Sequence, residues 1–252
     1  MTEVDLQHPS HGVSKHTLIQ SIFLHLLPGL LGGAAYYALA PLVRAWGFPT
    51  LAALILAGIL VLVPVELGLL YAGSRREGSI SPLGAVRYRQ PLPLPQYLLW
   101  VSVIFFSSAA LMTVLTPVSD GLQTLFQWIP GSFRVGMGLT GEYSRPALAA
   151  TYLAGLLVVV LIVPIVEEIY FRGYLLPRLP LGRPWVPLVH SALFALYHIW
   201  TPWMVVTRTI GVLPLIYVVR WKKNLTLGIL AHCLLNSIDI IIGLVFILQI
   251  SG

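Results

Sequence analysis

Long apolar segments constrain this chain more than any other feature of its sequence. A helix that crosses a lipid bilayer needs about 20 consecutive, mainly apolar residues. Apolar segments that approach or exceed this length lie at 17–43, 49–72, 97–116, 146–171, 186–200, 204–219 and 225–250. The last segment contains Asn236 and Asp239 near its middle, so it forms either one kinked helix or two short helices. The pattern therefore predicts an all-α fold, a polytopic transmembrane helical bundle with seven or eight spans.

The composition agrees with a membrane protein. Of the 252 residues, 57% are hydrophobic and only 10% are charged, whereas soluble domains contain about 25% charged residues. No hydrophilic stretch is long enough to form a second globular domain. The net charge of +6 indicates basic loops, so we expect no nucleic-acid partner. The single cysteine, Cys233, excludes an intrachain disulfide and a cysteine-rich zinc site.

The first 16 residues form a polar segment before the first apolar one. His8, His11 and His16 lie in it and have side chains that bind metals. The polar composition favours the other interpretation, a flexible and solvated tail.

Basic residues predict the orientation of the bundle. If the N-terminus is cytoplasmic, ten Lys and Arg residues fall in cytoplasmic segments and three fall on the opposite side. The ten are Lys15, Arg75, Arg76, Arg87, Arg89, Arg178, Arg183, Arg220, Lys222 and Lys223, and the three are Arg44, Arg134 and Arg145. Cytoplasmic loops are enriched in Lys and Arg. We therefore expect a cytoplasmic N-terminus, and a place in the plasma membrane if the organism is bacterial or archaeal.

Two connecting segments have patterns of their own. Residues 117–145 contain Leu122, Leu125, Phe126 and Ile129 at helical spacing, which is typical of an interfacial helix. An ordinary connecting loop is an equally good interpretation. The proline-rich segment at 87–96 predicts an extended connector.

Charged residues interrupt the apolar segment at 146–171, in the sequence IVEEIYFRG. A charge at the bilayer centre costs about 2.5–3.5 kcal/mol on insertion scales, so such residues usually face the bundle interior and mark function. On a helix, Glu168 and Arg172 are i and i+4 and form a pair. Glu167 points about 100° away and has no partner on its own helix. We therefore expect a structural Glu168 and a Glu167 that is available as a general base. The alternative is that both glutamates only bridge helices.

Two later apolar segments contain histidines in the same spacing. FALYH places Phe194 and His198 at i and i+4, and HCLLN does so for His232 and Asn236. Two hydrogen-bond donors on one helix face are suited to hold an oxyanion. A histidine there is also suited to bind a metal.

Four other polar residues have plainer interpretations. We expect His190 to be structural, Cys233 to pack, and Glu66 to extend toward the interface near the end of its span. Asp239 either orients Asn236 or marks a break in the helix.

In this order, EExxxR, FxxxH and HxxxN on apolar segments resemble the motifs of the CAAX protease and bacteriocin-processing family, also called the ABI family. These are intramembrane endopeptidases that include the type II CAAX prenyl protease. Each motif alone is weak, but the ordered trio is specific. The resemblance covers about residues 146–250. It divides the chain into a polar tail (1–16), N-terminal transmembrane helices and loops (17–145) and a catalytic membrane domain (146–252).

The resemblance implies roles for the motif residues. Glu167 is then the water-activating base and works with His198, while His232 and Asn236 stabilise the tetrahedral oxyanion. Glu168, Arg172 and Phe194 support the site. The family has been described both as zinc proteases and as metal-independent glutamate proteases. This chain has no HExxH motif, so we expect no metal cofactor. The alternative is zinc bound by Glu167, His198 and His232.

The implied substrate is a protein or peptide associated with the lipid bilayer, prenylated in the CAAX case. Two other functions fit the same polar residues. One is a non-proteolytic membrane protein of this fold, such as an immunity or scaffold protein. The other is a proton-coupled transporter, because intramembrane acids and histidines are also typical of proton relays.

Overall fold

The computed structural model describes residues 13–249. Within them the backbone is helical apart from connecting segments and one isolated β-bridge between Arg89 and Asn224. The α-helices are α1 (Leu18–Ala45), α2 (Thr50–Ala57), α3 (Val63–Arg76), α4 (Leu94–Val114), α5 (Thr116–Gln123), α6 (Arg145–Leu157), α7 (Val163–Glu167), α8 (Trp185–Tyr197), α9 (Val205–Gly211), α10 (Leu213–Lys222) and α11 (Leu225–Gln249). The expected all-α fold is confirmed.

Three segments of π-helix widen two of the long helices. Gly58–Leu62 joins α2 to α3, Val158–Ile162 joins α6 to α7, and Glu168–Leu175 follows α7. The first two end just before a Val-Pro pair, at Pro64 and Pro164. Proline has no amide hydrogen to donate to the preceding turn, and the helical ladder is locally rearranged at such positions.

The spans are fewer than the sequence predicts. Within residues 13–249, five helices are long and apolar enough to cross a membrane: Leu18–Ala45, Thr50–Arg76, Leu94–Val114, Arg145–Arg178 and Leu225–Gln249. A sixth is obtained if α9 and α10, which are bent by 42° relative to each other, count as one broken span. The expectation of seven or eight spans is not confirmed.

Two segments account for this difference. Helix α8 has 13 residues and rises about 20 Å, which is shorter than the hydrocarbon core of about 30 Å. The segment at 225–250 forms a single helix, α11, from Leu225 to Gln249. Neither Asn236 nor Asp239 breaks it, because a polar side chain on a helix leaves the backbone hydrogen bonds intact.

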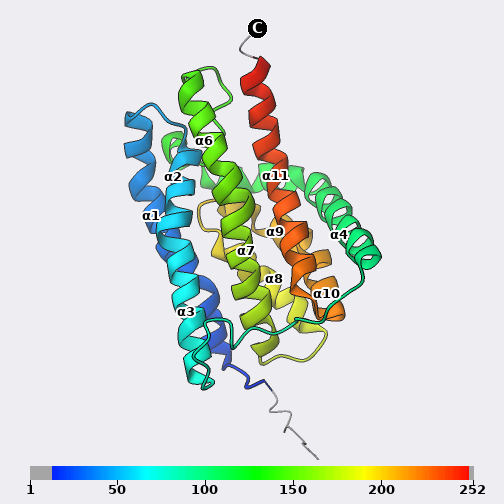
Figure 1. The fold of residues 1–252 in the computed structure, drawn as a ribbon. Helices are drawn as coiled ribbons and strands as arrows, with labels where there is room; N and C mark the ends of the chain where they lie inside the picture. The colour runs from blue at the N-terminus through cyan, green and yellow to red at the C-terminus, as the bar shows by residue number, and fades with distance from the viewer. Residues whose placement is uncertain (1–12, 250–252) are drawn as a thin grey trace, which may run out of the picture.

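The helices form one bundle in which the segments with the charged motifs lie close together. Figure 1 shows α1 beside α2 and α3 at one edge, α6, α7 and α11 across the middle, and α4 at the other edge. Helix α1 also packs against α8. A Cβ atom at Gly29 of α1 would lie 2.0 Å from the carbonyl oxygen of Tyr197. Only glycine permits this approach, which holds α1 against the end of α8.

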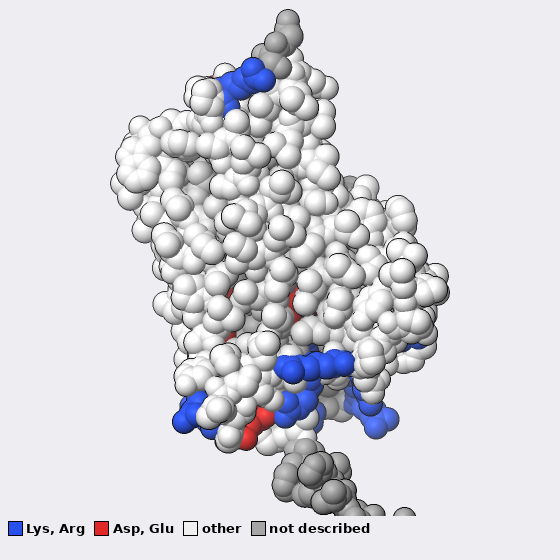
Figure 2. Space-filling model, in the orientation of Figure 1, with Lys and Arg blue, Asp and Glu red and all other residues white. Residues whose placement is uncertain are grey.

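Charges gather at the ends of the bundle. Figure 2 shows Lys and Arg concentrated at the lower end, where α1 begins and α3 ends in Figure 1, a smaller basic group at the opposite end, and a largely uncharged surface between them. Large hydrophobic side chains are exposed along this surface, including Phe23, Leu60, Phe106, Leu153 and Leu248. This distribution matches a protein whose middle is surrounded by lipid.

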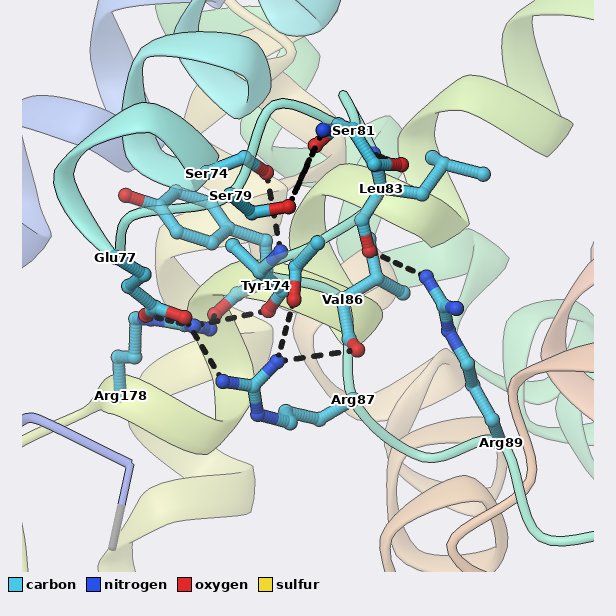
Figure 3. A network of polar contacts seen from close by, with 12 residues as sticks. Ser74, Glu77, Ser79, Ser81, Leu83, Val86, Arg87, Arg89, Tyr174 and Arg178 are labelled. Carbon is cyan, nitrogen blue, oxygen red and sulfur yellow. Dashed lines mark hydrogen bonds and ion pairs between the residues drawn. The ribbon is translucent and has the colours of Figure 1, made fainter. Parts of the chain in front are cut away.

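A network around Glu77 fastens the loop after α3 to the end of the π-helical segment (Figure 3). Glu77 accepts hydrogen bonds from Arg178 through Oε1 and from Arg87 through Oε2, the latter at 2.8 Å. Arg178 is buried and also donates to the carbonyl oxygens of Tyr174 and Ala85. The network therefore fixes the end of the helix that carries the EExxxR motif.

The segment just before α1 differs from the expected solvated tail. His16 is buried, its amide donates to the carbonyl of Arg178 at 3.0 Å, and its ring contacts Tyr174 edge-on. Lys15 donates to the carbonyl of Pro177 at 2.9 Å. The expectation is therefore wrong for His16, because carbonyls at the end of the π-helical segment supply partners for the tail's polar groups. His8 and His11 lie outside the described residues.

The structure agrees only in part with the predictions for the two connecting segments, 117–145 and 87–96. Within 117–145 the helix α5 ends at Gln123 and a short 3₁₀ turn follows, so Leu125 is exposed while Ile129 is buried. This segment is thus largely a connecting loop with a helical start. Residues 87–93 form a non-helical connector, whereas 94–96 belong to α4, so the connector is shorter than the expected 87–96. The amide of Leu225 donates to the carbonyl of Tyr88.

Candidate active site

The two adjacent glutamates lie where helix geometry changes. Glu167 is the last residue of α7 and Glu168 is the first of the π-helical segment Glu168–Leu175. Both side chains are buried, with residue exposures of 3% and 0%. Single π-helical turns occur frequently at functional sites, because the wider turn redirects side chains. An α-helical periodicity could not reveal this change.

The predicted pair of Glu168 and Arg172 is confirmed. Arg172 Nη1 lies 3.3 Å from Glu168 Oε1, and both side chains are completely buried. The guanidinium carbon of Arg172 also lies 3.8 Å from the centre of the Phe194 ring. A buried arginine is stabilised by a carboxylate and by the face of an aromatic ring. Phe194 therefore supports the first motif as well as its own helix.

His232 of α11 lies between the two glutamates. Its Nδ1 is 2.9 Å from Glu168 Oε1, and its Nε2 is 3.7 Å from Glu167 Oε2. A carboxylate only accepts hydrogen bonds, so Nδ1 carries a hydrogen and donates a hydrogen bond to Glu168. Nε2 is then the ring nitrogen that faces Glu167. Glu168 is thus more than the structural partner of Arg172, since it also fixes the orientation of His232.

His198 directly follows the last residue of α8. Its Nδ1 donates to the carbonyl oxygen of Phe194 at 2.8 Å, because a carbonyl has no proton to give. Nε2 is left as the acceptor nitrogen. The ring of Phe194 contacts both histidines, with centroid distances of 4.8 Å to His198 and 6.2 Å to His232. Phe194 therefore connects all three motifs.

Asn236 has a partner that the sequence does not reveal. Its amide Nδ2 donates to the backbone carbonyl of Val159 at 3.0 Å. Val159 lies in the π-helical turn Val158–Ile162. An asparagine amide carries two hydrogens, so one remains for another acceptor. Asp239 is exposed on an unbroken α11, so it marks no break in the helix.

The site also contains two residues to which the sequence pattern gave no role there, Tyr197 and Glu66. The hydroxyl of Tyr197 donates to Glu167 Oε1 at 3.1 Å and lies 2.8 Å from Glu66 Oε1. Glu66 is 1% exposed, so the expectation that it extends toward the interface is wrong. Tyr197 directly precedes His198, which was the only signal for it in the sequence.

The structural role expected for His190 agrees with its surroundings. His190 is completely buried, and its Nδ1 lies 3.0 Å from Nε2 of His25 in α1. Nδ1 of His25 donates in turn to the carbonyl of Ser21. The two histidines therefore hold α8 against α1. Cys233 is a free thiol of intermediate exposure in contact with apolar neighbours.

The donors for zinc do not converge in this arrangement. Each histidine donates its Nδ1 hydrogen to a carboxylate or carbonyl, as metal-binding histidines usually do. However, residues 13–249 contain no group of three His, Cys, Asp or Glu side chains placed to bind one metal ion. Glu167, His198 and His232 therefore do not fit a three-ligand zinc site.

Comparison with protein-family models gave a match over part of the chain. The family model described as Type II CAAX prenyl endopeptidase Rce1-like matches residues 149–238. The match includes every residue of the three motifs, whereas Glu66 and His25 lie outside it. A search of curated proteins and a search of solved structures each gave no match. The Rce1-like family is a family of proteases, so the match supports peptide hydrolysis in general terms.

Proposed function

We propose that this protein is an intramembrane endopeptidase that hydrolyses a peptide bond of a membrane-associated protein or peptide. One observation supports this most strongly. His232 is held by Glu168 on one side and faces Glu167 on the other, within a set of buried side chains from three separate helices. A paired acid and histidine in a water-poor site are the groups that general acid–base hydrolysis requires.

The reaction begins with a water molecule bound by Glu167 and His198. Glu167 Oε2 accepts one hydrogen of the water, and His198 Nε2 accepts the other. The water oxygen attacks the carbonyl carbon of the scissile bond while its proton moves to Glu167. The carbonyl oxygen becomes an oxyanion. Glu167 then returns the proton to the leaving nitrogen, and the carbon–nitrogen bond breaks to give a carboxylic acid and an amine.

The oxyanion requires donors, and Asn236 and His232 supply them. The second amide hydrogen of Asn236 is not used by Val159. His232 donates from Nε2 when that nitrogen is protonated, while Nδ1 remains bound to Glu168. Such fixed donors stabilise the transition state more than the substrate, because the charge develops only during the reaction.

An apolar cavity next to His198 supports a substrate with an apolar portion. The cavity has a volume of about 420 Å³ and is lined entirely by apolar and aromatic residues, namely Tyr37, Phe126, Trp128, Ile129, Pro130, Phe133, Ile199 and Pro202. Ile199 is the residue after His198. A prenyl group or an apolar peptide segment has the chemistry to fill this space.

The experiment that tests this function identifies the cleaved peptides. Membrane peptides from cells with the wild-type protein and with Glu167→Ala are compared by mass spectrometry. The proposal predicts new termini that depend on Glu167, and the residues beside them define the substrate. If the two samples contain the same termini while a solute is transported in a Glu167-dependent manner, the proton-coupled transporter is the better function. A phenotype without cleavage or transport favours an immunity or scaffold role.

We also propose that the basic end of the bundle lies in the cytoplasm, together with the N-terminus. The enrichment of Lys and Arg at that end supports this orientation. Cysteines introduced in the loop at 77–89 should react with a membrane-impermeant reagent only after the cells are opened. Labelling of that loop in intact cells would reverse the orientation.

A further inference from the structure

The hydroxyl group of Tyr197 lies between two buried carboxyl groups. It is 2.8 Å from Glu66 Oε1 and 3.1 Å from Glu167 Oε1. Tyr197 is completely buried, and the two glutamates are 1% and 3% exposed. Three helices contribute to this cluster, because Glu66 lies in α3, Glu167 ends α7 and Tyr197 ends α8.

The number of hydrogens at this cluster is informative. A phenol has one hydrogen to donate, and two ionised carboxylates have none. If both glutamates were ionised, one short contact would bring two oxygen lone pairs together without a hydrogen between them. A second hydrogen on one carboxyl group removes this conflict, since that carboxylic acid then donates to the phenol oxygen. The cluster therefore holds at least one neutral carboxyl group.

The neighbouring charges indicate which carboxyl group is neutral. Glu167 Oε2 lies 3.7 Å from Nε2 of His232, which forms an ion pair with an ionised Glu167 when both ring nitrogens are protonated, and the adjacent Glu168 pairs with Arg172. Within residues 13–249, the hydrogen-bond partner of the Glu66 carboxyl group is the Tyr197 hydroxyl, at 2.8 Å. Arg172 is paired with Glu168, and the Tyr170 hydroxyl donates to the carbonyl of Leu24. No ion pair of Glu66 appears there, so the hydrogen belongs on Glu66.

This arrangement gives the two oxygens of Glu167 different environments. Oε1 accepts a hydrogen bond from Tyr197, whereas Oε2 faces His232. We propose that Tyr197 and Glu66 are positioning residues: neutral Glu66 donates to Tyr197, and Tyr197 donates to Glu167 Oε1, which keeps Oε2 directed toward His232. The role as a positioning pair for hydrolysis rests on the proposed function, but the location of the hydrogen does not.

Infrared spectroscopy tests the location of the hydrogen without any substrate. A neutral carboxyl group has a C=O stretch that is separate from that of a carboxylate. Purified wild-type protein at neutral pH should show one such band from a buried carboxylic acid. The band should disappear in Glu66→Gln and shift in Tyr197→Phe. It should be unchanged in Glu142→Gln, which alters an exposed carboxyl group in the connecting segment before α6.

Three results would overturn this location. They are the absence of the band in the wild type, its persistence in Glu66→Gln, and its selective loss in Glu167→Gln. Because the measurement needs no cleavage, it decides the location of the hydrogen even if the protein proves not to be a protease.

Kinetics with a cleaved peptide then test the positioning role. Glu66→Leu removes the donor to Tyr197 and should lower kcat about tenfold with little change in KM, the effect of one lost hydrogen bond. Glu66→Gln should restore most of this loss, because its amide also donates to the phenol oxygen. Equal losses in both variants, or a change confined to KM, would overturn the role. The unfolding temperature of each variant shows whether it folds.

Discussion

His232 Nδ1 lies 2.9 Å from Glu168 Oε1, the same oxygen that lies 3.3 Å from Arg172 Nη1. Glu168 therefore serves two motifs at once, since it balances the charge of Arg172 and fixes the ring of His232. The side chain of Glu168 is completely buried. If it were removed, bulk water would not readily take its place as a hydrogen-bond partner of Arg172 and His232.

Removing the Glu168 carboxylate should destabilise the fold. Glu168→Ala leaves Arg172 as a buried charge without its ion-pair partner, and breaking such a pair typically costs about 3–5 kcal/mol. The free energy of unfolding in detergent measures this cost. The double variant Glu168→Ala with Arg172→Met should lose less unfolding free energy than the sum of the losses in the two single variants. Arg183→Gln, at an exposed position, is the control and should have little effect. Additive losses would contradict the pairing.

Asn236 should contribute mainly to the transition state. Asn236→Ala removes an oxyanion donor, and the loss of one such donor typically lowers turnover about 10²–10³-fold. KM should change little. Ser237→Ala is a matched control on the same helix, because the Ser237 hydroxyl donates only to the carbonyl of Leu234. A rise in KM with an unchanged kcat would mean that Asn236 binds substrate instead. The unfolding temperature separates either result from loss of the contact with Val159.

Docking of the segment before α1 should depend on pH. Burial lowers the pKa of His16 from 6.5 to about 4. The undocked segment therefore binds a proton below about pH 6.5, while the docked ring stays neutral until about pH 4. Docking is complete above pH 6.5 and weakens as the pH falls toward 4.

A spin label at Val13 measures this transition, in a background in which Cys233 is replaced by serine. Its mobility should rise as the pH falls from about 6.5 to 4. His16→Phe should remove this dependence, because phenylalanine has no titrating group. An identical transition in both proteins would assign it to another residue.

Exhaustive chelation should leave hydrolysis nearly unchanged. Asparagine is a poor ligand for zinc, and the acid and histidines of the site do not form a three-ligand group within the described part of the chain. The rate is measured on one preparation before and after treatment with a chelator. Reversible loss of activity, restored by stoichiometric zinc, would assign Glu167, His198 and His232 as ligands.

The sequence reveals the contacts within a helix better than those between helices. The pairing of Glu168 with Arg172 follows from their spacing, because residues four apart lie on the same face. The contact of Glu168 with His232 joins residues 64 positions apart, and no local pattern encodes it. For the same reason, Glu66 and Tyr197 were not connected with the site.

Apolar composition predicts only some of the membrane spans and none of the π-helical turns. Apolar composition locates Leu18–Ala45, Thr50–Arg76 and Arg145–Arg178 well. It does not distinguish a span from a buried helix such as α8, because both are apolar. It also misses the π-helical turns, which depend on how Pro64 and Pro164 alter the preceding hydrogen bonds.

Hydrolysis by the purified protein with Glu167→Gln tests the central claim most directly. Glutamine has nearly the shape of glutamate and still accepts a hydrogen bond from Tyr197, but it is not able to take a proton from water. With a peptide cleaved by the wild type in lipid vesicles, the variant should have an unchanged unfolding temperature and no measurable cleavage. Cleavage at a rate close to that of the wild type would contradict the role of Glu167 as the base.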